Sequence, residues 1–381
     1  MRGTFAVVTA CVAVVLGIPA AVPAAEAQPH GNGPPEPGAV CRIDDPAVDE
    51  ASGLVAGDGR WYAVNDGGTV LRVYALDRGC AVTDVITDPT DPYDVEDLAR
   101  AADGTFWLAD IGDNRSARDT VALHALRPGD GSTLYRLTYP DGAHDAEAVL
   151  LDREGTPYIV TKSVTGTSGV YRPAAALQSP GPTPLERVGS VTVPPTGTPG
   201  GPVGTAGTLL ITGGATSHDG RVVALRTYTD AYLYPAPDGD VVAALQRDPV
   251  RIPLPGEPQG EAIAFQPDGT LVSVSEGVGN PVRVVRDATD LVTGSGGGGP
   301  ERDGSAGDGT DDDAHAKGGR GPAGPDDGRR ADRGSAGDAQ RHGDAQRDGD
   351  ASGFPPVPVG VGALVIGLLG AILVVVRRRR S

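Results

Sequence analysis

A repeated motif is the feature that most limits the folds open to this chain. Each copy starts with an apolar run headed by Glu or its equivalent, followed by Asp-Gly or Glu-Gly and then a second apolar run. The copies start at residues 50, 96, 147, 212 and 261, which are 46, 51, 65 and 49 residues apart. Asp-Gly between two apolar runs indicates a hairpin, because glycine accepts the positive φ that a tight turn needs.

The region 39–291 that contains these copies has the pattern of an all-β domain. Its apolar runs are short, turn residues are abundant, and no long segment has a 3.6-residue period. Repeats of this length, each with four antiparallel strands, predict a β-propeller. Five blades are favoured, and six are possible if the 65-residue spacing contains another. The last copy supplies three strands, so residues 39–43 are predicted to add the fourth and close the ring.

The cysteines support this closure. Cys11 lies in the N-terminal apolar segment, which leaves Cys41 and Cys80 in the predicted domain. In an exported chain two such cysteines predict one disulfide. Cys41 would lie on the outer strand of the last blade and Cys80 on that of the first, so their bond would lock the ring.

Both ends of the chain predict export and anchoring. A basic start, a short apolar run and Ala25-Glu26-Ala27 predict a signal peptide over 1–27; an uncleaved N-terminal anchor is the alternative. Residues 356–376 predict a transmembrane helix, and the arginines of the basic tail 377–381 place that end in the cytoplasm. A cell-wall sorting signal is less suited because no LPxTG motif precedes the run. The expected location is the cell membrane, with the domain outside.

Two polar segments flank the predicted domain. Residues 28–38 are expected to be flexible, and residues 292–355, rich in Gly, Asp and Arg, are expected to form a disordered stalk because they have almost no aliphatic residues to bury. The acidic run 311–313 lacks the spacing of an EF-hand loop. The net charge of −18 argues against nucleic acid as a partner and makes cations the more natural small ligands.

Polar residues of the repeats are expected to gather on one face. In a propeller the first strand of each blade lines the channel and the second returns beside it, so the start of one and the end of the other share a face. The first-strand residues are predicted to ring the channel mouth as metal ligands: Glu50, Glu96, Glu147 and Glu261. The second-strand ends supply predicted ligand-binding residues: Asn65, Asp66, Asp110, Asp113, Asn114, Lys162, Arg226 and Glu276.

Carboxylates gathered at one mouth repel each other unless they are protonated, hydrogen-bonded or neutralised by a cation. Oxygen ligands of this kind suit Ca²⁺ or Mg²⁺ better than zinc, and Ca²⁺ is the expected cofactor. Two structural alternatives remain open. The glutamates can accept backbone N–H bonds from the neighbouring blade, and the mixed charges can form an ion-pair network.

No common catalytic motif is present. The chain lacks G-x-S-x-G, H-E-x-x-H, a P-loop and a Rossmann fingerprint. His144 beside Asp145 offers a general base, but its place at a turn favours a solvated histidine.

Several segments carry a resemblance to known proteins. Asp94-Val-Glu-Asp-Leu-Ala99 and Asp110-Ile-Gly-Asp-Asn-Arg115, with Glu50-Ala-Ser-Gly-Leu54 and Gln259-Gly-Glu-Ala-Ile-Ala264, resemble a group of actinobacterial secreted propeller proteins without an assigned activity. More remotely, the domain looks like WD40-like, esterase-like-phytase and gluconolactonase propellers, several of which hold a cation at the channel. Thr212 departs from the Glu of the other copies, which breaks a symmetric acidic ring.

Two functions fit these observations. The first is a surface-displayed binding or scaffolding propeller that presents one face to an extracellular protein, a glycan or a cell-wall component. The second is a metal-dependent hydrolase of the lactonase or phosphoesterase type, in which a channel-mouth cation activates water.

Overall fold

The computed structural model of the chain describes residues 35–294. The predicted signal peptide and transmembrane helix lie outside these residues, as do the basic tail and nearly all of the stalk. None of the helices within residues 35–294 is long and apolar enough to cross a membrane.

The described residues form an all-β domain with a few short helices. In the first half of the domain the strands are β1 (Gly38–Arg42), β2 (Ala51–Gly57), β3 (Arg60–Asn65), β4 (Leu71–Leu76), β5 (Val82–Asp88), β6 (Val95–Arg100), β7 (Phe106–Asp110), β8 (Val121–Arg127), β9 (Gly131–Thr138) and β10 (Ala146–Leu151). The second half contains β11 (Pro157–Thr161), β12 (Thr167–Pro173), β13 (Thr183–Thr192), β14 (Ile211–Thr216), β15 (Val222–Thr227), β16 (Asp230–Pro235), β17 (Val250–Pro253), β18 (Gly260–Phe265), β19 (Leu271–Ser275) and β20 (Pro281–Val285). The helices are a 3₁₀ turn, Gly204–Thr208, with α1 (Val241–Ala244) and α2 (Asp290–Thr293).

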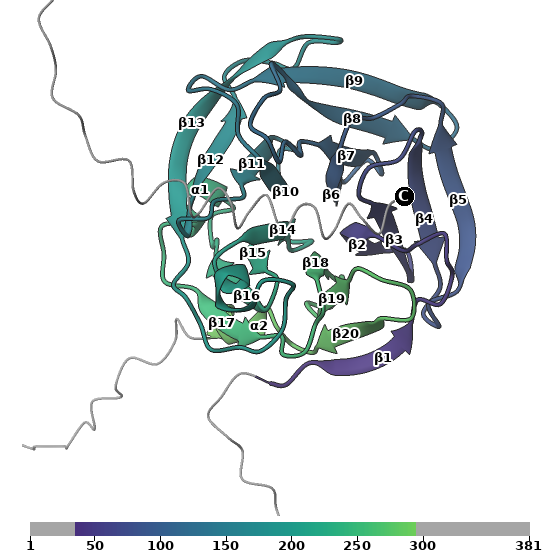
Figure 1. Ribbon diagram of the computed structural model, residues 1–381, viewed down its shortest axis with the longest axis vertical. Helices are drawn as coiled ribbons and strands as arrows, with labels where there is room; N and C mark the ends of the chain where they lie inside the picture. The colour runs from purple at the N-terminus through teal and green to yellow at the C-terminus, as the bar shows by residue number, and fades with distance from the viewer. Residues whose placement is uncertain (1–34, 295–381) are drawn as a thin grey trace, which may run out of the picture. The chain divides into compact units, whose positions relative to one another are not determined.

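Successive strands pair antiparallel and build sheets around a common centre (Figure 1). Strands β2–β5 form one four-stranded sheet and β14–β17 another. A larger sheet of eight strands consists of two antiparallel runs, β6–β9 and β10–β13, which are joined where β13 and β9 pair in parallel at Thr183↔Leu137. The first strand of each run lies innermost, as a propeller requires.

The N-terminal strand completes the last sheet, as the sequence predicts. β1 pairs antiparallel with β20, with Gly38 opposite Val284, and gives the order β1-β20-β19-β18. The disulfide between Cys41 and Cys80 then links this sheet to the turn after β4 of the first. The strand pairing and the disulfide are confirmed, but the predicted place of Cys80 on the outer strand is wrong, because Cys80 lies in the turn before β5.

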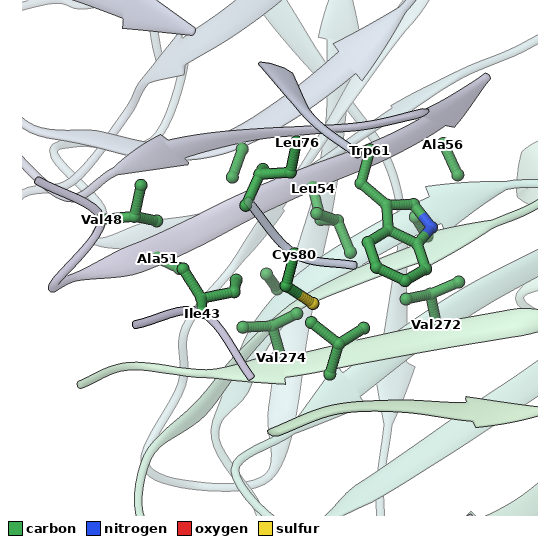
Figure 2. Packing of buried hydrophobic residues seen from close by; sticks show 14 of the residues in the cluster. Ile43, Val48, Ala51, Leu54, Ala56, Trp61, Leu76, Cys80, Val272 and Val274 are labelled. Atoms are coloured by element: carbon green, nitrogen blue, oxygen red, sulfur yellow. The ribbon is translucent and has the colours of Figure 1, made fainter. Parts of the chain in front are cut away.

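Apolar side chains fill the spaces between neighbouring sheets. Figure 2 shows one such cluster, in which Leu54 and Trp61 of the first sheet pack against Val272 and Val274 of the last, beside Cys80. Comparable clusters join β2–β5 to β6–β9, β6–β9 to β10–β13, β10–β13 to β14–β17, and β14–β17 to β18–β20. Each sheet is therefore buried on both faces, and the last packs on the first.

The wide spacing before the fourth copy has a local explanation. Between β13 and β14 the chain forms a long connection whose regular structure is the 3₁₀ turn. Thr196 and Thr198 of this connection donate their hydroxyls to the buried Asp230 carboxylate, at 2.8 and 2.7 Å. The extra residues thus form a loop tied to β16 and add no strand.

Candidate functional site

Every innermost strand carries a β-bulge at the same place in the repeat. The pairing of these strands with their neighbours skips one residue in each: Ser52, Glu96, Glu147, Thr212 and Glu261. Bulges re-aim side chains, and all these residues are buried at the start of their strands. The bulge is therefore the structural position that the repeated glutamates share.

This position corrects the register of the first copy. Glu50 lies just before β2, and the residue equivalent to Glu96 is Ser52. Ser52 Oγ donates to the carbonyl of Glu96 at 2.5 Å, and Thr212 Oγ1 donates to that of Gly260 at 2.9 Å. In two of the four-stranded runs the bulge residue thus ties its run to the next one, whereas in the other three runs it is a glutamate.

Three carboxylates come together on one side of the mouth. One oxygen from each of Asp66, Asp94 and Glu96 lies within 4.8 Å of the others. Gly112 makes this approach possible, because a Cβ there would overlap Glu96 Oε1 and would lie 2.6 Å from Asp94 Oδ2. Glu96 lies on β6, whereas Asp66 follows β3 and Asp94 precedes β6. Converging carboxylate oxygens of this kind are the donor set that Ca²⁺ and Mg²⁺ prefer.

Burial and mutual repulsion disfavour the charged forms of this cluster. Burial and the charge of Asp66 raise the pKa of Asp94 to about 8. Burial, with the charges of Asp66, Glu147 and Asp94, raises the pKa of Glu96 well above its usual range. A divalent cation between the carboxylates would remove this penalty.

Asp110 fixes the backbone just before β6, in the segment that contains Asp94. Its two oxygens accept the backbone N–H groups of Tyr93 and Asp94, both at 3.0 Å, and contact Arg118 at 2.8 Å and His124 at 3.2 Å. Burial alone would raise the pKa of Asp110, but these donors outweigh it and lower the pKa to about 2. The structure therefore gives Asp110 a positioning role beneath the mouth.

Replacing Asp110 by Asn is expected to lower the unfolding free energy at pH 7 by about 2 kcal/mol. This value follows from the difference between the pKa of Asp110 in the unfolded chain, near 4, and its pKa in the folded protein, about 2. A depressed carboxyl pKa stabilises the fold above the unfolded value. This stabilisation fades as the pH falls through 4 towards 2, so the variant and wild type should converge there. Urea unfolding at several pH values measures the difference. A difference that is independent of pH would contradict the assignment.

A lysine faces the cluster from the next four-stranded run, β10–β13. Lys162 Nζ pairs with Glu147 Oε1 and donates to Tyr228 Oη at 3.0 Å. Burial alone would lower the pKa of Lys162, but Glu147 and the neighbouring acidic groups outweigh it and raise the pKa well above its usual range. Glu147 Oε2 is buried without a hydrogen-bond partner in the described structure. Lys162 is therefore a fixed positive charge beside a carboxylate with spare acceptor capacity.

The last sheet adds two further carboxyl groups. Glu261 Oε1 accepts from Gln259 Nε2 at 3.1 Å, while its Oε2 is buried without a partner among the described residues. Burial and the charge of Glu261 raise the pKa of Glu276 to about 11, and Asp66 and Glu50 contribute. Glu50 thus lies near the mouth, although it does not occupy the bulge position. It lines a small cavity of about 210 Å³ with Asn65 and Asp66.

Arg226 lies in a different place from the one predicted. β15 continues to Thr227, so the residue that matches Lys162 just past the second strand is Tyr228. Arg226 is fully buried between β15 and the last sheet, where it pairs with Glu257 at 2.7 Å and donates to the carbonyl of Ala262 at 3.1 Å. Arg226 therefore belongs to a buried ion pair, as expected from the alternative in which the mixed charges form an ion-pair network.

The remaining predicted residues lie in the loop after β7 or at the end of β3. Asp113 accepts the N–H groups of Ala117 and Arg118, which shapes the loop after β7, and Asn114 beside it is exposed. Asn65 donates to the carbonyl of Ala47 at 2.9 Å. These contacts are those of loop-forming residues.

Asp97 is a central residue that sequence reasoning missed. Its carboxylate is fully buried and accepts N–H bonds from Leu98, from Val149 of β10 and from Gly214 of β14. Burial raises the pKa of Asp97 well above its usual range, although these donors oppose the shift. Asp97 therefore accepts backbone N–H bonds from neighbouring strands, which is the structural role that one alternative gave to the glutamates.

Asp94 and Asp145 were also missed, although the sequence contained a signal. Both stand two residues before a bulge glutamate, in the pattern Asp-x-Glu, and Glu50 and Gln259 occupy the same place before Ser52 and Glu261. In each case the backbone carbonyl accepts an N–H from just past the second strand: Asp66 to Glu50, Gly112 to Asp94, Lys162 to Asp145 and Glu276 to Gln259. The mouth is thus lined by two staggered rows of polar residues.

Comparisons with known proteins found matches among solved structures. No protein-family model and no curated protein matches the chain. Similar solved structures include a gluconolactonase of Xanthomonas campestris (14% identity, 66% of this chain and 97% of that chain, TM-score 0.38). Others are virginiamycin B lyase of Staphylococcus aureus (11%, 65% and 70%, 0.35) and the PQQ-bound aldose sugar dehydrogenase of Streptomyces coelicolor (10%, 66% and 99%, 0.35). Within residues 35–294, the chain is an all-β domain of antiparallel sheets with a propeller-like arrangement.

Proposed function

We propose that this chain is a cell-surface binding propeller that holds a divalent cation, with Ca²⁺ the best fit, at the mouth formed by Asp66, Asp94 and Glu96. The observation that carries the proposal is the convergence of these oxygens within 4.8 Å. The nearby buried Glu147 Oε2 and Glu261 Oε2 are acceptors without partners among the described residues. Both could bond waters of the cation, because polar groups this buried normally have partners.

The proposed architecture is five blades on an anchored stalk. Five antiparallel four-stranded runs and the five apolar clusters between them support that blade count. Export and anchoring are supported by the apolar segment 356–376 with the arginines after it. The Cys41–Cys80 disulfide is consistent with an oxidising location.

Calcium is expected to stabilise the full-length protein. Adding Ca²⁺ to about 100 times its Kd contributes about 2.7 kcal/mol, which for a domain of this size raises Tm by about 5–10 °C. EDTA should reverse the shift. Differential scanning fluorimetry across a Ca²⁺ series, with Mg²⁺ in parallel, measures the effect.

Matched variants separate this site from general charge effects. Asp94→Asn combined with Glu96→Gln should abolish the shift and leave the Tm without calcium equal or higher, because two repelling carboxyls become neutral. Glu154→Gln removes one exposed charge at a hairpin turn and should keep the full shift. Absence of a calcium shift in wild type, or its persistence in the double variant, would refute the cation site.

A metal-dependent hydrolase is the second candidate. The observation that favours it is Lys162, held by Glu147 and Tyr228 next to the carboxylate cluster, where its positive charge could orient an anionic or carbonyl substrate. Lactones and phosphate esters tested with calcium-loaded protein would reveal this activity, and Lys162→Met should abolish it while keeping the calcium shift.

A further inference from the structure

A second cavity lies at the other end of the innermost strands. These strands run from their bulge residues to the hairpin turns, and the cavity is lined by turn residues such as Asp58, Gly104 and Asp219. Its volume is about 1260 Å³, larger than the ~300–1,000 Å³ usual for small-molecule pockets. Val149 and Gly214, whose N–H groups bind Asp97, also line it. Asp97 therefore lies between the cavity and the acidic mouth.

An aromatic surface forms part of the cavity wall. Trp107 of β7 and Tyr135 of β9 both line it, with ring centroids 5.8 Å apart and planes inclined by 24°. The small side chain of Ala125, on the strand between them, lets the two rings meet. Both residues remain partly exposed, so part of the surface of this stacked pair is open to the cavity.

Paired charges surround this aromatic surface. Arg100 bonds Asp58 at 2.6 Å and Arg127 bonds Asp103 at 2.8 Å. Arg100 also lies over the rings of Tyr62 and Phe106, at 5.2 and 5.1 Å, which fixes its guanidinium. Arg100 and Arg127 already have carboxylate partners, so these two pairs offer donors and acceptors side by side. Arg153 also lines the cavity, and its Nε donates to the backbone carbonyl of Asp219 at 2.9 Å.

From these features we infer that this second cavity, at the hairpin turns of the innermost strands, binds a neutral oligosaccharide. A sugar ring has one apolar C–H face, which suits the Trp107–Tyr135 surface, and hydroxyl groups at its edge that both donate and accept. Alternating carboxylates and guanidiniums satisfy such hydroxyls, whereas a phosphate would meet the acidic turns. The cavity volume of about 1260 Å³ favours several linked sugars over one. This site is separate from the cation mouth and does not depend on it.

Tryptophan fluorescence gives a direct test on the full-length protein, purified without glycoside detergents. The chain has two tryptophans, and Trp61 is 3% exposed, so a saccharide-induced change reports Trp107. Maltotriose, mannotriose and the trimer of N-acetylglucosamine serve as probes. At least one should give a saturating change below about 10 mM, ten times the Kd of a weak complex of about 4 kcal/mol.

Variants assign the binding to the aromatic surface. Tyr135→Ala, which keeps Trp107, should weaken binding about tenfold, as expected for loss of one aromatic contact. Trp107→Ala should abolish binding in titration calorimetry, while Trp107→Phe should retain part of it. The Asp94→Asn/Glu96→Gln variant should bind the trisaccharide like wild type.

Three outcomes would overturn the inference: no response to any trisaccharide, wild-type affinity in both alanine variants, or tight binding of a tripeptide such as trialanine with the same dependence on Trp107. Circular dichroism of each variant separates lost binding from lost folding. Failure of this test leaves the calcium experiment unaffected, because the two sites use different residues.

Discussion

Replacing Arg226 by Met is expected to lower the unfolding free energy by about 3–5 kcal/mol, among the largest effects of any single change in the domain. Arg226 is fully buried, and its partner Glu257 is 2% exposed. Without the arginine, the Glu257 carboxylate keeps one side-chain donor, Ser273 Oγ at 2.9 Å, but loses its counter-charge. Urea unfolding followed by circular dichroism measures the loss.

Two comparisons show whether the buried charge is the cause. Arg187→Met removes an arginine that faces Asp141 at 3.8 Å on the surface, and it should cost at most about 1 kcal/mol. Arg226→Met combined with Glu257→Leu removes both charges and should recover at least half of the loss. A double variant as unstable as the single one would show that packing is responsible.

Removing the Cys41–Cys80 bond is expected to cost about 3–4 kcal/mol. The bond closes a loop whose ends are 39 residues apart, and it fastens the sheet containing β1 to the first sheet. The Cys41→Ser/Cys80→Ser variant should therefore have a lower urea midpoint than wild type.

Reducing agent provides the control for this prediction. Dithiothreitol should lower the midpoint of wild type towards that of the double variant and leave the variant unchanged. A wild-type midpoint insensitive to complete reduction, verified by thiol titration, would mean that strand pairing alone holds β1.

The sequence was sufficient for the repeat, its hairpins and its closure. Asp-Gly turns need a positive φ, and Asp58 and Gly59 have φ values of 53° and 72°. The last copy lacks one strand, which predicted that residues 39–43 supply it, and β1 lies there. These features depend on local chemistry and on counting, both of which a sequence displays.

The site was less predictable because it depends on register. Aligning Glu50 with Glu96 matched residue types, whereas the bulges align Ser52 with Glu96. A bulge arises from how two strands pair and leaves no fixed residue type behind. Arg226 was misplaced for a related reason: the second strand of the fourth copy runs to Thr227, further than the apolar pattern suggested.

The place of β1 has a consequence for the order in which the domain is completed. Among the strands of residues 35–294, β1 is synthesised first, yet its pairing partner β20 is synthesised last. Cys80 emerges long before β20, so oxidation can attach β1 to the first sheet at the seam, the place where the first and last sheets meet. β20 pairs with β1 there later. The seam thus makes completion of the ring wait for the end of the domain, and a chain truncated before Pro281 would leave an open sheet edge.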